Sequence, residues 1–155
     1  MGATRVTRFV RAPRPAVYRA LLDPQAVRQW RVPEDMTCEV HAFEPHEGGT
    51  FRVSVTYDLA AVAGKTSERT DTYHGRFAKL VPDRMVVEVI EFETEHPALR
   101  GEMTVTTTLS DADGGTRIVG VHEGLPPGVP PEDNEEGWRQ ALAKLAAYVE
   151  AMERK

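Results

Sequence analysis

Near its C-terminus the chain carries an apolar stripe at helical spacing, which must be buried against another layer of structure. The members of this stripe advance by three or four residues: Trp138, Ala141, Leu142, Leu145, Val149 and Met152. Arg139, Lys144 and Glu150 lie away from it, as in an amphipathic helix with one buried face. Asp133 is placed to cap this helix, with Glu136 three residues later as in a capping box.

Most of the preceding sequence alternates with period two, which is typical of strands with one buried face. The alternation is clearest at Phe51, Val53, Val55 and Tyr57, and it recurs more weakly at Cys38, Val40 and Ala42. Gly48-Gly49 supplies the turn between these two segments. Further strands are expected at about 5–10, 71–80, 84–92, 102–110 and 116–123.

Two short helices and two long loops complete the predicted element order. Pro15 favours a helix after the first strand, and Asp23-Pro24 begins a second helix that ends near Trp30. Residues 59–70 bury little and predict a mobile loop, and four prolines within 124–131 predict another. We therefore expect an α+β fold, in which a curved antiparallel sheet of about six or seven strands wraps around the long C-terminal helix.

Composition narrows the class of protein. The 155 residues suit one domain over 1–155, and a net charge of -5 with scattered cations argues against a nucleic-acid partner. No apolar run is long enough for membrane insertion. A single cysteine, Cys38, and the absence of a signal segment predict a cytoplasmic location. Neither a phosphate-binding glycine loop nor a Rossmann fingerprint is present, so we expect no cofactor.

Several local signatures occur in an order shared with a known family. They are Ala12-Pro13 with Val17 and Leu21, Asp23-Pro24 reaching Trp30, Gly48-Gly49 before Phe51, Gly75 followed by Leu80-Val81-Pro82, Gly114-Gly115-Thr116 leading to His122-Glu123-Gly124, and Gly137-Trp138. Together they resemble the START-like, or SRPBCC, superfamily, and within it the subfamily of the activator of the Hsp90 ATPase (AHSA1-like). The resemblance covers residues 5–152.

The resemblance implies a helix-grip fold with a cavity that relatives use for lipids, sterols, polyketides and other apolar molecules. This chain departs from the family where Trp30 is flanked by Gln29 and Arg31, because members often carry two tryptophans there. The eukaryotic co-chaperones also have a separate N-terminal domain that this sequence lacks, so we do not expect an Hsp90-type chaperone to be the main partner. A small hydrophobic molecule is the expected partner.

The predicted ligand-binding residues are large side chains whose pattern or motif position places them inward, together with one histidine. They are Trp30, Phe51, Tyr57, Tyr73, Val87, Met103, His122, Trp138 and Leu142, and Met85 belongs with them by parity. The alternative for each apolar member is ordinary core packing. Loops 59–70 and 124–133 would then act as the gate.

His122 is the polar candidate of this set. It shares a strand face with Ile118 and Gly120, although Val119 and Val121 on the opposite parity allow the inverted assignment. If it points inward, the imidazole can donate a hydrogen bond to a ligand carbonyl, or act as acid or base in a cyclase- or aromatase-like enzyme. The alternative is a strand-end histidine held by a backbone partner.

The remaining polar candidates favour structural roles. Tyr73 and Phe77 are the better inward pair on their strand, which leaves His74 and Arg76 in solvent. The cluster His41, Glu44, His46 and Glu47 lacks metal-ligand spacing, so we expect no metal site. The apolar neighbours of Cys38 indicate an inert buried thiol. Val119 and Val121, if outward, would leave an apolar strip that hints at a homodimer.

Overall fold

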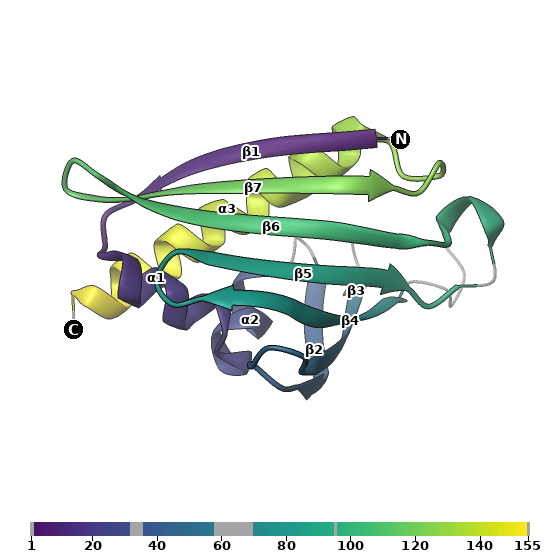
Figure 1. Cartoon of the computed structure of the whole chain (residues 1–155), viewed down its shortest axis with the longest axis horizontal. Coiled ribbons are helices and arrows are strands. Elements are labelled where there is room, and N and C mark those ends of the chain that lie inside the picture. The colour runs from purple at the N-terminus through teal and green to yellow at the C-terminus, as the bar shows by residue number, and fades with distance from the viewer. Residues whose placement is uncertain (1, 32–35, 58–69, 95, 155) are drawn as a thin grey trace.

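The chain folds into a curved antiparallel sheet that a long helix crosses on its inner side (Figure 1). The computed structural model describes residues 2–31, 36–57, 70–94 and 96–154. Within them the elements are β1 (Gly2–Val10), α1 (Arg14–Leu21), α2 (Pro24–Trp30), β2 (Met36–Phe43), β3 (Thr50–Tyr57), β4 (Thr70–Val81), β5 (Met85–Phe92), a 3-10 helix (Pro97–Leu99), β6 (Glu102–Ala112), β7 (Gly115–Leu125) and α3 (Pro131–Glu153). The α+β class predicted from the sequence is confirmed.

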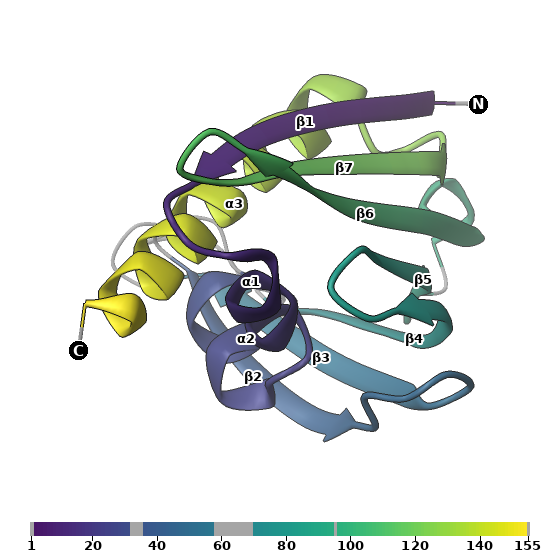
Figure 2. The same ribbon diagram turned by 60° about the vertical axis from the view of Figure 1, so that its left-hand side comes forward.

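The described strands form one seven-stranded sheet in the order β1-β7-β6-β5-β4-β3-β2. Strands β2 to β7 follow one another as a simple meander, and the first strand, β1, pairs with the last, β7. Figure 2 shows α3 crossing the open side of the curved sheet, while α1 and α2 lie together beside the C-terminal half of α3. Among the described helices, none is long and apolar enough to span a membrane.

The helix starts follow proline placement. The Asp23 side chain accepts a hydrogen bond of 2.9 Å from the Gln25 N–H, so the predicted cap of α2 is confirmed. The predicted Asp133 cap of α3 is wrong, because the helix begins at Pro131 with Pro130 before it. Proline lacks the N–H that a first turn leaves unpaired and has a preset φ, so α3 begins earlier and places Asp133 inside its first turn.

Strand parity is confirmed where the alternation was clean and wrong where it was not. Phe51, Val53 and Val55 face inward on β3, as do Tyr73 and Phe77 on β4. On β2 a register shift between Val40 and Ala42 leaves Ala42 exposed, and it turns Phe43 toward Phe51 and Phe77 instead.

On β5 the inward residues are Val86, Glu88 and Ile90. Val87 therefore points to the outer face, and the prediction that it lines a cavity is wrong, as is the inward assignment of Met85. On β7, Ile118 and His122 are buried, which settles the parity left open by the sequence. Val119 and Val121 lie outward and are half-buried, and a homodimer through them stays a prediction.

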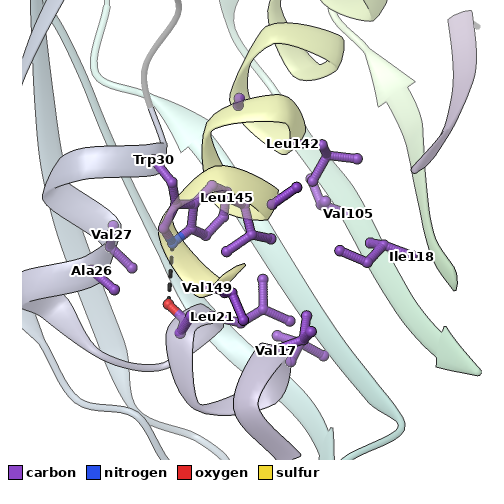
Figure 3. Packing of buried hydrophobic residues seen from close by; sticks show 14 of the residues in the cluster. Val17, Leu21, Ala26, Val27, Trp30, Val105, Ile118, Leu142, Leu145 and Val149 are labelled. Atoms are coloured by element: carbon purple, nitrogen blue, oxygen red, sulfur yellow. Dashed lines mark hydrogen bonds between the residues drawn. The ribbon is translucent and has the colours of Figure 1, made fainter. Parts of the chain in front are cut away.

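The core forms where the C-terminal half of α3 meets α1, α2 and the sheet (Figure 3). Leu142, Leu145 and Val149 from the helical stripe are at most 2% exposed. Full burial of each such side chain stabilises the fold by roughly 1.5–3 kcal/mol. The Trp30 indole N–H donates to the Ala20 carbonyl at 3.1 Å, which ties α2 to α1 (Figure 3). Met152, predicted as part of the stripe, is 50% exposed.

Candidate functional site

The layers separate beside the N-terminal half of α3, where a cavity of about 340 Å³ lies between helix and sheet. Small residues of α3, Gly137 and Ala141, stand here in place of the leucines that fill the core further along. The other lining residues come from α3, the loop before it, the end of α2 and strands β3 to β7: Arg31, Val55, Asp71, Tyr73, Ile90, Phe92, Met103, Val105, His122, Val129, Asp133, Asn134 and Trp138. Most of this surface is apolar.

Four of the predicted site residues lie on this lining, namely Tyr73, Met103, His122 and Trp138. Three others, Trp30, Phe51 and Leu142, are at most 2% exposed and are packed in the core rather than on the lining. The Tyr57 side chain and residues 59–69 of the predicted gate fall outside the described residues, and the last residue of that gate, Thr70, begins β4. Of the second predicted gate, Val129 and Asp133 lie on the lining. Contact of any of these residues with a ligand stays a prediction.

A buried ion pair forms the polar part of the cavity wall, and the sequence reasoning missed it. Arg31, the C-cap residue that directly follows α2, donates from Nη1 and Nη2 to the two oxygens of Glu88 on β5, at 2.7 and 3.0 Å. Burial alone would lower the pKa of Arg31, but the Glu88 carboxylate outweighs it and the pKa is raised. Arg31 is thus a fixed, neutralised cation.

Aromatic rings surround the Arg31 guanidinium. Its central carbon lies 5.2 Å from the Trp138 ring centroid and 5.7 Å from those of Trp30 and Tyr73. The Phe51 ring is 5.9 Å away. Such contacts favour a cation that has left water. Burial also raises the pKa of Tyr73 to about 12, so its phenol is neutral at physiological pH.

His122 is held in one tautomer by two residues from other elements. The Thr4 hydroxyl on β1 donates to Oδ1 of Asn134 on α3 at 2.6 Å, which orients the amide. The Asn134 Nδ2 group then donates to Nδ1 of His122 at 3.2 Å. Because Nδ1 accepts, the proton of the neutral imidazole sits on Nε2. That nitrogen is buried and has no hydrogen-bond partner among the described residues.

Electrostatics keep this histidine neutral. Burial, followed by the charge of Arg31, lowers the pKa of His122 to about 3. A group with that pKa takes up a proton poorly at neutral pH, so its suitable chemistry is donation of one hydrogen bond. The adjacent Glu123 is exposed on the outer face, as expected from strand alternation.

The other polar candidates lie apart from the cavity. His41 contacts Ser54 on the outer side of β2 and β3, and the Glu44 carboxylate binds Thr50 in the turn. Among the described residues, no three His, Cys, Asp or Glu side chains are grouped to hold a metal ion. Cys38 is half-buried, and burial raises the pKa of its thiol, which disfavours the reactive thiolate.

A curved antiparallel sheet gripping a C-terminal helix, with an apolar cavity between them, defines the helix-grip class of START-like proteins. Within this class, the family described as Activator of Hsp90 ATPase homolog 1-like protein matches residues 11–150. The chain belongs to this family. A comparison with curated proteins finds no match.

Solved structures share the whole fold. A protein of Chromobacterium violaceum is 32% identical, with a TM-score of 0.86 and 96% of each chain covered. An AHSA1-like protein of Aeromonas hydrophila is 16% identical, with a TM-score of 0.73. The match covers 99% of this chain and 96% of that chain. DynU16, described as a protein in the dynemicin biosynthetic locus, is 22% identical with a TM-score of 0.67. The match covers 96% of this chain and 47% of DynU16.

Proposed function

We propose that this protein binds a small apolar molecule in the cavity between its sheet and α3. The observation that carries the proposal is the space of about 340 Å³ with a mainly apolar lining. Its volume falls within the range of roughly 300–1,000 Å³ typical of small-molecule sites. A helix–sheet interface built only for stability would be filled, because an unfilled apolar cavity lowers the stability of a fold.

The lining suggests how the molecule is held. Trp138 and Phe92 offer flat aromatic surfaces, and Met103 offers a flexible thioether that adapts to different shapes. His122 supplies a polar anchor deep in the wall, while the exposed Asp71 and Asp133 lie toward solvent. This combination favours a compact lipid-, polyketide- or aromatic-type molecule.

The experiment that tests this function looks for the molecule directly. Native mass spectrometry of protein purified under mild conditions should reveal a bound species of small mass. A thermal-shift panel of fatty acids, sterols and aromatic polyketides should raise the melting temperature for some members, because a ligand that binds only the folded state stabilises it. No adduct and no stabilisation by any member would contradict the proposal.

A second candidate is a cyclase-like enzyme that uses the same cavity, because a shaped apolar cavity with one hydrogen-bond donor can position a substrate for reaction. Beside it stands only the description of DynU16 as a protein in a biosynthetic locus. In such a reaction we expect His122 to act as a hydrogen-bond donor and not as the general base. Its lowered pKa suits polarisation of a carbonyl by the Nε2–H group rather than proton abstraction. If His122→Phe leaves the turnover of every cyclisable substrate unchanged, that role is excluded.

An interaction with an Hsp90-type chaperone is a separate hypothesis, supported by the family description alone. It is tested by a pull-down with such an ATPase, followed by measurement of its hydrolysis rate. Stimulation that persists when the cavity is blocked would favour the chaperone role over ligand binding.

A further inference from the structure

The unpaired Nε2–H group of His122 indicates the chemical class of molecule that the cavity can bind. His122 is 3% exposed and lines the cavity, and its Nε2 atom has no hydrogen-bond partner among the described residues. Most buried polar groups in folded proteins are paired, so a buried N–H left free beside a cavity indicates an acceptor that arrives with a ligand.

The other ring nitrogen of His122 is held by a chain of two hydrogen bonds, which argues against a histidine that merely fills the core. Thr4 and Asn134 are 130 residues apart in the chain, yet both take part in fixing the ring, through hydrogen bonds of 2.6 and 3.2 Å. They leave the proton on Nε2 and the ring neutral. The site therefore presents one donor of fixed direction.

The charges around the cavity argue against an ionised ligand. Arg31 is the only cation among the lining residues that the structure describes, and Glu88 already neutralises it through two hydrogen bonds. Asp71 and Asp133 add negative charge to the lining. A carboxylate would meet repulsion at the mouth and no unpaired cation inside, while an ammonium group has no lone pair to accept the His122 proton.

Nε2 has to be uncovered before a ligand oxygen can accept its hydrogen bond, and the neighbouring ring that also lines the cavity is Trp138. The ring centroids of His122 and Trp138 are 4.6 Å apart in an edge-to-face arrangement. Nε2 has almost no accessible surface in this arrangement. Trp138 is half-buried and lines the cavity, so we expect its indole to turn when a ligand binds.

Resting on the proposed function, we infer that the cavity is selective for electrically neutral carbonyl compounds, whose oxygen accepts the hydrogen bond of His122 while their apolar body lies against Met103 and Trp138. Ketones, esters and amides on a compact ring system satisfy both requirements. Fatty acids and other anions do not.

The test is a matched series of three naphthalenes: 2-acetylnaphthalene, the hydrocarbon 2-isopropenylnaphthalene of the same shape, and 2-naphthoate. Dissociation constants are measured by calorimetry with the wild-type chain and with His122→Phe, which keeps a ring and removes the donor. His46→Phe, at an exposed turn position, is the control variant. Side-chain ¹⁵N spectra of His122 report the state of the Nε2–H group directly.

In the wild type the ketone should bind about three- to tenfold more tightly than the hydrocarbon, as one net hydrogen bond allows, and naphthoate should bind most weakly. The ketone should shift the Nε2–H resonance, and its advantage should vanish in His122→Phe. Equal binding of ketone and hydrocarbon to the wild type overturns this inference and leaves the proposed function standing. Preference for naphthoate overturns it as well. No binding by any of the three contradicts both proposals.

Discussion

Arg31, at the end of α2, and Glu88, in the middle of β5, neutralise each other in the wall of the cavity, with side chains that are 7% and 5% exposed. The pair joins the end of α2 to the centre of the sheet, and Glu88 lies on the buried face of β5 together with Val86 and Ile90. Glu88 also neutralises the positive charge of Arg31, which would otherwise attract an anionic ligand.

Removing one partner of this pair should strongly destabilise the fold. Arg31→Met or Glu88→Leu alone leaves a buried, unpaired charge, and each should lower the free energy of unfolding by about 3–5 kcal/mol. The double variant should be clearly more stable than either single variant, because it leaves no charge behind. Urea denaturation checks this. Glu93→Leu, which breaks the exposed pair with Arg52, is the control and should have a much smaller effect. A double variant less stable than both singles would contradict the account.

Filling the cavity should block binding without unfolding the protein. Ala141 lines the cavity from α3, and Ala141→Phe should weaken the binding of 2-acetylnaphthalene by more than about tenfold, or about 1.4 kcal/mol. Ala147, exposed on the same helix, provides the matched control, and Ala147→Phe should leave affinity unchanged. Calorimetry on both variants decides. Equal affinities would place the ligand elsewhere.

The neutral state of His122 predicts a specific dependence of stability on pH. Its pKa is lowered from the ordinary 6.5 to about 3 by burial, so below pH 6.5 the unfolded chain takes up a proton that the folded chain does not. Stability should fall as the pH drops from 6.5 toward 3, by up to about 1.4 kcal/mol per pH unit from this group. Denaturation at pH 7, 6 and 5 should show a steeper fall for the wild type than for His122→Phe. Identical slopes would mean that the folded protein binds the proton.

Two glycines should respond in opposite directions to the same substitution. A methyl group at Gly75 would collide with the Val89 carbonyl and the Phe51 ring, so Gly75→Ala should destabilise the sheet. At Gly120 the nearest atom, the Val6 carbonyl oxygen, is 4.0 Å from the added carbon. Gly120→Ala should therefore be neutral or stabilise by up to about 1 kcal/mol, because it restricts the unfolded chain. Thermal unfolding compares the two, and a more stable Gly75→Ala would refute the packing described for β3 and β4.

The fold was predictable because its periodicities are strong. The α3 stripe and the alternation of Phe51, Val53 and Val55 each reflect burial of one face, and local sequence is enough to show that. Proline in the first turn was the signal that corrects the start of α3, since Pro131 precedes Asp133.

The cavity wall was predictable only in part, because it depends on contacts between distant residues. On β5 the residues of both faces are largely apolar, so the sequence pattern does not show which face is buried. If the charged Glu88 is assumed to face solvent, its neighbour Val87 has to point inward. The opposite is true because Arg31, 57 residues earlier, neutralises Glu88 inside the protein. The available signals were Glu88 within an apolar strand and Arg31 next to Trp30, where family members often carry two tryptophans. That these two residues pair could be learned only from the tertiary structure.

The most direct measurement is a methyl spectrum of protein labelled with ¹³C-methyl methionine, titrated with 2-acetylnaphthalene. Met103 lines the cavity, Met85 lies on the outer face of β5, and Met152 is 50% exposed on α3, so one sample holds both the probe and its controls. Saturable shifts of the Met103 resonance, with Met85 and Met152 unchanged, are predicted. Shifts confined to Met85 or Met152, or none at saturating ligand, would contradict a binding site between the sheet and α3.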